Sequence, residues 1–499
     1  MLATQTIKNK TAIVIGAGFS GLSAATNLAA KGWQVQILEK HNQAGGRARR
    51  FEKDGFVFDM GPSWYWMPDV FERYFGLFGK KVSDYYKLIR LDPSYRIFFE
   101  DGPIDIPATP AAVAQLFETL EVGAAQKLEA FLKEAAYKYQ VGIHKLVHKP
   151  GQSITEFLDL DVAKGVLKLD IFTNMQKHVS RYFKHEKIRK IMEFPVLFLG
   201  ALAADTPALY SLMNYADIDG GTWYPEHGMY SIVQAMEALA KEKGVNFKFN
   251  CAVAKANIVD NKIQSVEDAS GNTYTADIII NSADYNFFEQ NILPASHRQY
   301  SADYWQKRKM APSCLLYYVG VNKKLENLPH HTLFFDTNFD THGDEIYKTE
   351  QWPSAPLFYM SVVSKTDAGS APADSENIFL LIPIAAGLEG DNEMLRTKYF
   401  NMLCDRIEQL TGNKISDCIT SYTSYSVENF KEDYGAFKGN AYGLANTLLQ
   451  TAILKPSLRS KKISNLFYTG QLTVPGPGVP PSLISGEVVA NFVEKNYIP

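Results

Sequence analysis

Three glycines near the start of the chain have the spacing of a dinucleotide-binding turn. Gly16, Gly18 and Gly21 form the pattern G-x-G-x-x-G, and Glu39 follows eighteen residues after the last of them. In such a turn the first glycine permits a tight bend, the second lets the backbone approach a pyrophosphate, and the third lets a helix pack closely on a strand. A carboxylate at the position of Glu39 can bind the hydroxyl groups of a ribose.

The elements needed to position these glycines occur in the required order. Residues 12–15 are apolar, as expected of a buried parallel strand, and an alanine-rich segment that ends near Lys31-Gly32 predicts a helix. Residues 34–38 predict a second strand, and the helix N-terminus would offer N–H groups to phosphates. We therefore favour dinucleotide binding over the alternative, a glycine-rich turn in an ordinary βαβ unit. The residues predicted to contact the cofactor in this unit are Gly16, Ala17, Gly18, Phe19, Ser20, Gly21, Glu39 and Lys40.

A second glycine pair indicates which dinucleotide binds. Gly45-Gly46-Arg47 comes just after the expected ribose acid, and Asp59-x-Gly61-Pro62-Ser63 follows. NAD enzymes have no need of such a loop, whereas in FAD enzymes of the amine oxidase type a similar loop lies along the pyrophosphate and the flavin. Arg47 offers a fixed cation there. A solvated basic loop is the alternative for Arg47 and Arg49, and we disfavour it because the motifs occur together.

Residues 244–284 predict a third contribution to the cofactor site. They indicate short strands joined by turns at Asp260-Asn261 and Ser270-Gly271-Asn272. In FAD folds of this kind, the residue after the first of these strands contacts the adenine through its backbone, and by position that residue is Val253. A plain β-meander is the alternative.

The C-terminal stretch "FYTGQLTVPGPGVPPSLISGE" (467–487) predicts a stiff turn that closes the same site. It indicates a strand that ends at Gly470, a proline-rich turn that includes Val479 and Pro480, and a helix from near Ser482. The N-terminus of that helix can stabilise negative charge on a reduced flavin.

Composition narrows the functional classes. The chain has 499 residues and a formal net charge of -3, so its charge does not suggest a nucleic-acid partner. Aromatic residues make up 13% of the chain, and we therefore expect a large apolar interior or an apolar ligand. The four cysteines are scattered without zinc spacing and are expected to be small buried residues in a reducing compartment. No signal peptide, membrane-spanning helix or metal site is predicted.

The chain resembles the bacterial-type carotenoid desaturases, the phytoene desaturase family, within the flavin-containing amine oxidase superfamily. Besides the two N-terminal motifs, the resemblance rests on "PALYSLMNYADIDGGTWYPEHGMYSIVQAM" (207–236) and "YTGQLTVPGPGVPPSLISGE" (468–487), so it extends over essentially the whole chain. The family commonly has a histidine in a T-x-P-G segment. Here that segment is Thr473-Val474-Pro475-Gly476, so a catalytic role for that histidine is not carried over.

The resemblance implies an FAD-dependent enzyme that inserts conjugated double bonds into phytoene and its intermediates towards lycopene. A quinone or oxygen would reoxidise the flavin, and the enzyme would be cytoplasmic and peripheral on the inner face of the cell membrane, because its polyene substrate lies in the bilayer. Alternatives in the same family are a hydroxycarotenoid 3,4-desaturase and a carotenoid isomerase. Further alternatives are an amine oxidase, a protoporphyrinogen oxidase, and a flavin-free prenyl-lipid-binding chaperone like the Rab GDP dissociation inhibitors.

We expect an α/β fold in which a Rossmann-like FAD-binding domain is interleaved with a mixed-sheet substrate domain and a helical, membrane-facing part. The FAD-binding domain would take residues 1–85, 225–290 and 455–499, the substrate domain 86–110 and 291–454, and the helical part 111–224.

Few side chains outside the cofactor motifs can be given a role from the sequence. No catalytic acid or base is assigned. Residues 194–204 are expected to form a membrane or tunnel segment or a buried core helix, and 165–183 a solvated helix face or a membrane contact. Glu226, His227 and the pair His330-His331 are expected at the surface.

Overall fold

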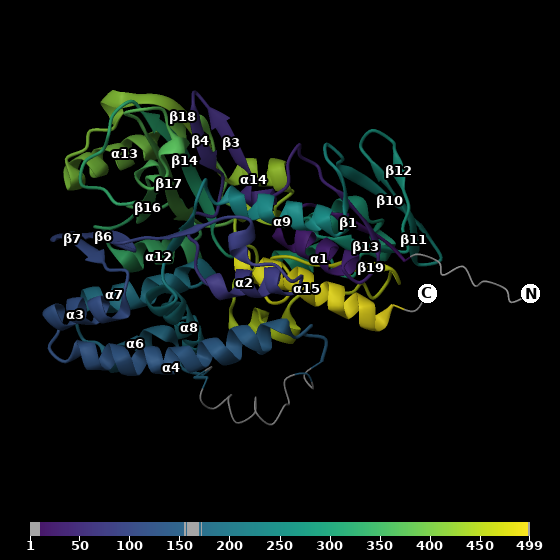
Figure 1. Cartoon of the computed structure of the whole chain (residues 1–499), viewed down its shortest axis with the longest axis horizontal. Helices are drawn as coiled ribbons and strands as arrows, with labels where there is room; N and C mark the ends of the chain where they lie inside the picture. The colour runs from purple at the N-terminus through teal and green to yellow at the C-terminus, as the bar shows by residue number, and fades with distance from the viewer. Residues whose placement is uncertain (1–9, 154–155, 157–168, 171, 498–499) are drawn as a thin grey trace, which may run out of the picture.

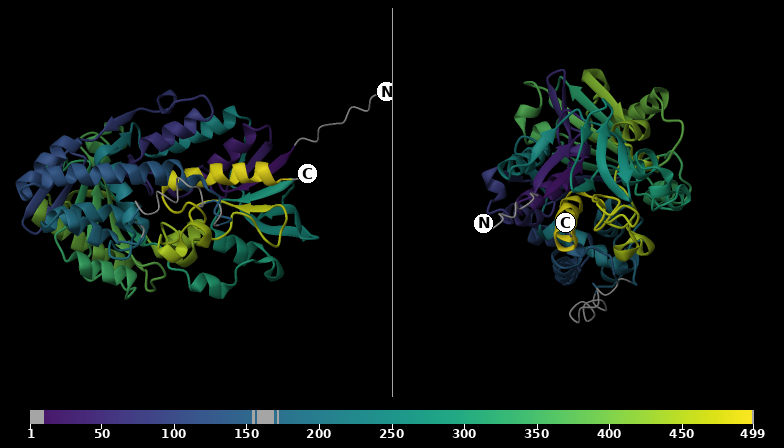
Figure 2. Two further views of the ribbon diagram at one scale, coloured as in Figure 1. Left: turned by 90° about the horizontal axis from the view of Figure 1, so that it is seen from below. Right: turned by 90° about the vertical axis from the view of Figure 1, so that its right-hand side faces the viewer.

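The computed structural model describes residues 10–153, 156, 169–170 and 172–497. Figure 1 shows three parts: a sheet with α1, α9 and α15 on the right, a larger sheet covered by α13 at the upper left, and a layer of helices below. In both views of Figure 2, β1 and the last turns of α15 lie at the same end of the molecule. The first strand and the last helix therefore belong to one part of the fold.

The sheet on the right is parallel and has the strand order β19-β13-β1-β2-β9. Its central strand β1 is apolar and almost entirely buried, as the sequence predicts for a strand covered on both faces. The strands are β1 (Thr11–Ile15), β2 (Gln34–Leu38), β9 (Asn246–Lys248), β13 (Ile278–Asn281) and β19 (Leu466–Tyr468). The helices beside it are α1 (Phe19–Ala29), α9 (Tyr230–Glu242) and α15 (Val479–Asn496).

A small antiparallel sheet extends from this part. Its strands are β10 (Val253–Val259), β11 (Lys262–Asp268) and β12 (Thr273–Tyr274). The predicted turn at Asp260-Asn261 is confirmed, and both residues have positive φ angles of 50° and 56°, as a tight two-residue hairpin requires.

The larger sheet has the strand order β18-β14-β17-β16-β15-β6-β7, and only the pair β15–β6 is parallel. One face packs on α13 (Glu393–Thr411), and the other contributes Tyr318, Phe335 and Tyr359 to the core shared with the dinucleotide part. Side chains alternate between the two faces because successive residues of a strand point in opposite directions. The strands are β6 (Tyr95–Phe99), β7 (Gly102–Ile106), β14 (Ser313–Val321), β15 (His331–Phe335), β16 (Phe358–Ser361), β17 (Glu376–Ile384) and β18 (Ile419–Tyr425).

Helices form the lower layer. They are α3 (Pro110–Leu120), α4 (Ala124–His144), α6 (Met175–Tyr182), α7 (Glu186–Glu193) and α8 (Leu212–Asn214). Part of the segment 165–183 lies outside the described residues. Within the described part of the chain, no helix is both long and apolar enough to cross a membrane.

Several short elements connect these layers. They are β3 (Arg50–Lys53), β4 (Phe56–Asp59), α2 (Pro68–Gly76), β5 (Leu88–Arg90), β8 (Trp223–Pro225), α10 (Tyr285–Phe287), α11 (Ala302–Gln306), α12 (Phe339–Tyr347) and α14 (Val427–Tyr434).

Two expectations about local structure need correction. The segment from Phe194 to Leu199 is a 3₁₀ helix, not a regular core helix, and Phe194 and Val196 are buried in it. The last helix begins at Val479, earlier than the predicted start near Ser482, so Pro480 and Pro481 lie in its first turn. Prolines fit there because the first N–H groups of a helix have no partner within the helix. All four cysteines are buried, as predicted.

Candidate functional site

The glycine-rich turn joins β1 to the N-terminus of α1. Gly16 has a φ of 99°, a conformation that glycine adopts without strain. A Cβ atom on Gly21 would lie 2.1 Å from the carbonyl oxygen of Gly16, whereas a Cβ atom on Gly18 would meet no atom within 4 Å. The turn is therefore tightly packed at Gly21 and open at Gly18, which suits a phosphate bound over the helix N-terminus.

Glu39 holds a buried carboxylate beside this turn. The side chain is 4% exposed, and its Oε2 accepts the backbone N–H of Ala17 at 2.7 Å. The other oxygen accepts the N–H of His41 at 2.8 Å. Each oxygen keeps a second lone pair, so the carboxylate can also accept hydrogen bonds from ribose hydroxyls.

Two other residues predicted for the turn have mainly structural contacts. The Ser20 hydroxyl hydrogen-bonds the Ser282 hydroxyl after β13 at 2.8 Å, and Phe19 is buried in the core. These contacts fix the first turn of α1 against the neighbouring strand.

The loop that carries Arg47 folds back over the glycine turn. The N–H of Gly45 donates to the carbonyl of Ala17 at 2.8 Å, and a Cβ atom on Gly46 would lie 3.4 Å from the Cα of Gly18. Arg47 donates from Nη2 to the carbonyl of Asn440 at 3.3 Å, and its buried Nε has no hydrogen-bond partner among the described residues. Burial lowers the pKa of Arg47. A guanidinium held in this way, with a donor left over, fits an anionic cofactor.

Lys40 and Val253 extend the site beyond the C-terminal end of β2. The ammonium of Lys40 donates to the carbonyl of Glu432 at 2.7 Å, so its side chain binds the C-terminal end of α14. The chain just before Val253 runs beside Glu39, because the N–H of Cys251 donates to the carbonyl of Glu39 at 2.8 Å. The backbone of Val253 therefore lies close to the ribose acid.

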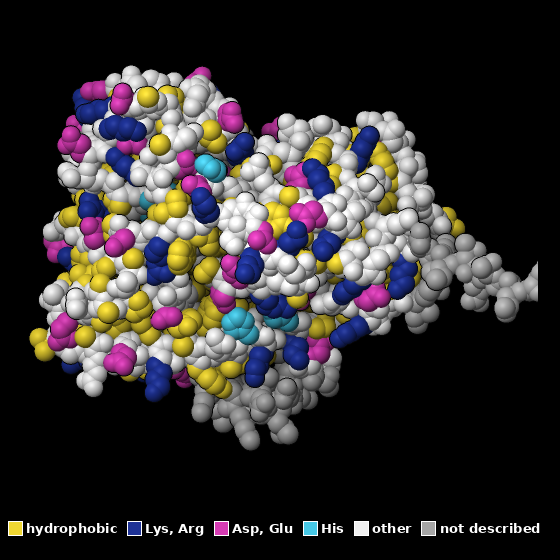
Figure 3. All heavy atoms as spheres, viewed as in Figure 1, with side chains coloured by type: hydrophobic (Ala, Val, Ile, Leu, Met, Phe, Trp, Pro, Cys, Tyr) yellow, Lys and Arg dark blue, Asp and Glu magenta, His cyan; other side chains and the backbone are white. Residues whose placement is uncertain are grey.

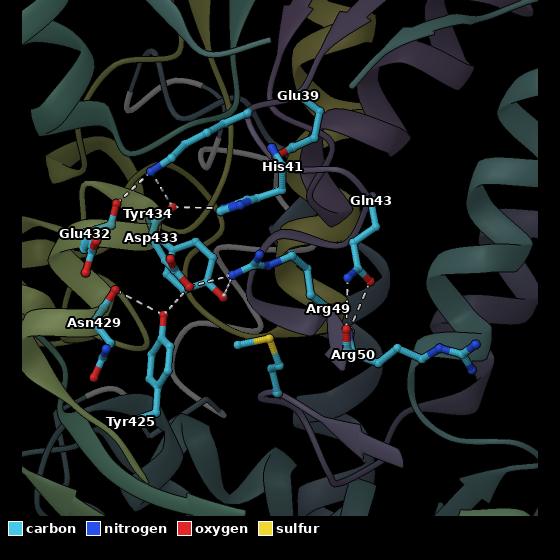
Figure 4. Close-up of polar contacts among 12 residues, drawn as sticks. Glu39, His41, Gln43, Arg49, Arg50, Tyr425, Asn429, Glu432, Asp433 and Tyr434 are labelled. Carbon is cyan, nitrogen blue, oxygen red and sulfur yellow. Dashed lines mark hydrogen bonds and ion pairs between the residues drawn. The ribbon is translucent and has the colours of Figure 1, made fainter. Parts of the chain in front are cut away.

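Arg49 joins this loop to α14, a contact that the sequence did not predict (Figure 4). Its Nη2 lies 2.6 Å from Oδ2 of Asp433, and the Tyr425 hydroxyl donates to the same oxygen at 2.9 Å. His41 approaches the backbone carbonyl of Asp433 at 3.1 Å. Arg49 is 9% exposed, so the alternative of a solvated basic loop is wrong at this position.

The segment from Gly61 to Ser63 leads from the cofactor turn to the larger sheet. A Cβ atom on Gly61 would lie 2.4 Å from the carbonyl oxygen of Arg47, so only glycine permits this approach. Gly61, Pro62, Ser63 and Trp64 remain partly exposed although the residues on either side of them, such as Phe58 and Tyr65, belong to one buried core. A flavin ring can lie against this partly exposed segment.

The C-terminal turn packs directly on the glycine turn. The N–H of Gly470 donates to the Ser485 hydroxyl at 3.0 Å, and a Cβ atom on Gly470 would lie 3.2 Å from Oγ of Ser20. A Cβ atom on Gly486 would lie 2.3 Å from the carbonyl oxygen of Ser20, so α15 touches α1 backbone to backbone. Val479 and Pro480 begin α15, and their side chains stay partly exposed at its N-terminus.

Lys455 is a buried residue at this turn that sequence reasoning missed. Its side chain is 6% exposed, and burial lowers its pKa to about 7. Its Nζ donates to Oδ1 of Asn446 at 3.0 Å. A single lysine in an irregular segment gives no sequence signal of burial, because most lysines are exposed.

The histidine pair at the start of β15, His330 just before the strand and His331 as its first residue, contradicts the sequence expectation. His330 is 5% exposed and His331 is 0% exposed, so the prediction of a surface pair is wrong. The ring of His331 stacks on Trp64 at 4.3 Å, and its Nδ1 lies 2.6 Å from the Tyr359 hydroxyl. Burial lowers the pKa of His330 to about 3, and burial together with the neighbouring His330 lowers the pKa of His331 well below its usual value, so both rings are neutral. By contrast, His227 is exposed, as expected, and Glu226 is partly exposed.

Comparison with known proteins gives a consistent result. A family described as "Flavin containing amine oxidoreductase" matches residues 19–493. The chain is 43% identical to a Haloarcula japonica protein named carotenoid 3,4-desaturase, over 96% of each chain. It is 29% identical to a Myxococcus xanthus protein named zeta-carotene-forming phytoene desaturase, over 96% of this chain and 92% of that one. A solved oxidoreductase from Methanosarcina mazei superposes with a TM-score of 0.62 at 14% identity, over 96% of this chain and 100% of that one.

The fold and the site define a flavin-dependent oxidoreductase. The glycine turn, the buried ribose acid and the arginine loop fit a dinucleotide, and the partly exposed segment from Gly61 to Trp64 can lie against a flavin. The chain belongs to the flavin-containing amine oxidoreductase family and, within it, to the carotenoid desaturases. Its cofactor is FAD, as predicted, and the alternative of a flavin-free chaperone is set aside.

Proposed function

We propose that the protein introduces a conjugated double bond at the 3,4 position of a carotenoid. The proposal rests on the higher identity to a carotenoid 3,4-desaturase, 43%, than to a phytoene desaturase, 29%. Desaturation of phytoene towards lycopene is the second candidate, favoured by the match to the phytoene enzyme over 96% of this chain.

A row of aromatic rings supports the proposal of an apolar, elongated substrate. It begins at Trp64, one residue after the flavin-facing turn, and ends at Phe339, a partly exposed residue at the start of α12. Neighbouring ring centroids are 5.3 to 6.0 Å apart along the series Trp64, Tyr95, Phe194, Phe335 and Phe339. A polyene that follows this row would reach the flavin while its other end stays near the surface.

The chain's contribution to the reaction is positioning. Bound FAD supplies the acceptor for a hydride from one carbon of the substrate, and a proton leaves the neighbouring carbon. The aromatic row aligns the substrate, and the buried cores keep water away from it. Arg47, on the loop after β2, and the N-terminus of α15, after the C-terminal turn, would both hold the cofactor. We assign no side chain as the proton acceptor.

We further propose that the enzyme works on the inner face of the cell membrane, with a quinone or oxygen as the acceptor that reoxidises the flavin. Figure 3 shows hydrophobic side chains gathered at the lower left, where α3, α7 and α12 lie. The aromatic row reaches the surface at α12, so an apolar substrate could pass from a bilayer into the protein there.

Pigment analysis tests the substrate. We would express the protein in one bacterial strain that accumulates phytoene and in another that accumulates lycopene or its hydroxylated derivatives, and separate the pigments by HPLC. The proposal predicts a longer chromophore only in the second strain. New conjugation in the phytoene strain alone would favour the second candidate, and unchanged pigments in both, with FAD-bound protein present, would contradict carotenoid desaturation.

A further inference from the structure

Lys455 places a buried positive charge beside the C-terminal turn without a counter-ion among the described residues. Among the described residues, its Nζ makes one hydrogen bond, to Oδ1 of Asn446 at 3.0 Å. An ammonium has three N–H donors, so this contact satisfies one of them. Lysine is almost never fully buried unless it is paired, and an unpaired buried charge lowers stability.

The backbone next to Lys455 is shaped around its ammonium group. Gly476 has a φ of 142°, and a Cβ atom there would lie 3.1 Å from Nζ of Lys455 and 3.0 Å from Oδ1 of Asn446. Gly476 precedes α15 by three residues, and α15 begins at Val479. The ammonium therefore lies against the turn that the cofactor site uses, close to the positive end of a long helix.

A second cation lies on the other side of the same turn. With the Gln471 amide turned so that its oxygen faces the guanidinium, that oxygen accepts from Nη2 of Arg47 at 2.9 Å. The turn from Gly470 to Gly478 thus runs between Arg47 and Lys455. Two cations and a helix N-terminus around one loop form a site for negative charge.

We propose that Lys455 stabilises the negative charge that the isoalloxazine ring of FAD acquires on reduction. A hydride brings two electrons and one proton, so the neutral oxidised ring becomes an anion unless a second proton follows. An ammonium held in a buried site offsets that charge more effectively than water does, because the local dielectric constant is low.

The burial of Lys455 makes its protonation sensitive to the negative charge that the flavin gains on reduction and loses on reoxidation. Burial alone lowers its pKa to about 7, and no charged side chain of the described residues contributes to the shift. Near neutral pH the amine is therefore partly neutral while the ring is oxidised. Negative charge beside it would raise its pKa and draw in a proton, so reduction and protonation of Lys455 would be coupled.

Sulfite binding provides a test that needs bound FAD but no carotenoid. Sulfite forms a bond to N5 of oxidised flavin with its own electron pair, which leaves a negative charge on the ring. We would titrate the FAD-loaded protein with sulfite and follow the flavin absorbance in wild type, Lys455→Met, Lys455→Arg and Lys461→Met. Lys461 is exposed close by in the sequence, so its variant is a control with the same change of net charge.

The proposal predicts that Lys455→Met raises the Kd for sulfite by about tenfold or more and lowers the flavin midpoint potential, while Lys461→Met does neither. Lys455→Arg should restore part of the affinity. Melting temperatures separate this role from a structural one, since methionine removes an unpaired buried charge and should keep or raise the melting temperature. Equal sulfite affinities in Lys455→Met and Lys461→Met, or loss of FAD or of stability in Lys455→Met, would overturn the proposal.

The inference depends on the proposed function only through the bound flavin. If sulfite binding depends on Lys455 but no carotenoid is desaturated, the inference stands and the proposed substrate fails. If a carotenoid is desaturated but sulfite binding does not depend on Lys455, the proposed substrate stands and the inference about Lys455 fails.

Discussion

The carboxylate of Asp59 caps the helix that follows Met229. Its Oδ2 accepts the N–H of Met229 at 2.7 Å, and its Oδ1 accepts the N–H of Tyr230 at 3.0 Å. Asp59 ends the strand that leads to the flavin-facing turn, and Tyr230 begins α9, which packs on α1. The contact therefore joins two motifs that lie 170 residues apart in the sequence.

Gly228 is expected to be indispensable for this cap. Its φ is 100°, and a Cβ atom there would lie 2.9 Å from Oδ2 of Asp59. We predict that Gly228→Ala lowers the free energy of unfolding by about 2–4 kcal/mol, because backbone strain and a steric clash combine. Gly244→Ala is the control: its φ is 89° but its Cβ would meet nothing within 4 Å, so only the backbone term, about 1–2 kcal/mol, should remain. Equal losses in denaturant unfolding would contradict the role of the cap.

Two substitutions in the glycine turn should separate cofactor binding from folding. Gly18→Ala adds a methyl group where no protein atom lies within 4 Å, at a φ of -74° that alanine tolerates. We predict that this variant melts like the wild-type apoprotein but binds FAD at least tenfold more weakly, since the methyl group would occupy the space over the helix N-terminus. Gly21→Ala should lose stability even without FAD, because its Cβ would lie 2.1 Å from the carbonyl oxygen of Gly16. Isothermal titration and thermal melts of both variants check this, and normal FAD affinity in Gly18→Ala would mean that the phosphate does not lie there.

Asp217 should make stability depend on pH. It is 2% exposed and accepts the Tyr95 hydroxyl at 2.7 Å, and burial raises its pKa to about 7. The folded protein therefore binds this proton more tightly than the unfolded chain does, so stability falls as pH rises from about 4 to 7 and stays low above that range.

Asp217→Asn cannot ionise and keeps an oxygen for Tyr95. We predict that the variant gains about 1–3 kcal/mol over wild type at pH 8, and that the gain shrinks steadily towards pH 4. Unfolding by urea across this pH range measures the difference, with Asp219→Asn, an exposed carboxylate, as the control. A gain that does not change with pH would show that Asp217 titrates normally.

The surface end of the aromatic row can be tested with one added charge. Phe339→Asp should leave FAD absorbance unchanged but lower turnover of carotenoid in liposomes by about tenfold, because a carboxylate at this point disfavours an apolar chain or a bilayer. Met394→Asp, at a residue 85% exposed at the start of α13, should have no effect. If both variants turn over substrate at the wild-type rate, the substrate enters elsewhere.

The sequence was informative where local spacing determines structure. The glycine turn, the strand that ends at Glu39 and the hairpin at Asp260-Asn261 each follow from a short pattern with a physical reason. The closeness of the two chain ends could also be anticipated, because both carry motifs for one cofactor.

The sequence was less informative where burial depends on distant segments. His331 looks like a surface residue until β15 is placed between β16 and β6, and Lys455 looks ordinary until Gly476 packs against its ammonium. The contact of Arg49 with Asp433 joins residues 384 positions apart, and no local pattern reports it. The start of α15 was placed too late because Pro480 and Pro481 were expected just before the helix, whereas both lie in its first turn.

Anaerobic mixing of the FAD-loaded protein with liposomes that carry a candidate carotenoid tests the central claim most directly. The flavin spectrum reports reduction, and the carotenoid spectrum reports the length of the conjugated system. We predict that the flavin loses its visible absorbance while the carotenoid bands shift to longer wavelength, with one new double bond for each flavin reduced. A flavin that stays oxidised with every carotenoid offered, although the protein binds FAD, would contradict the account.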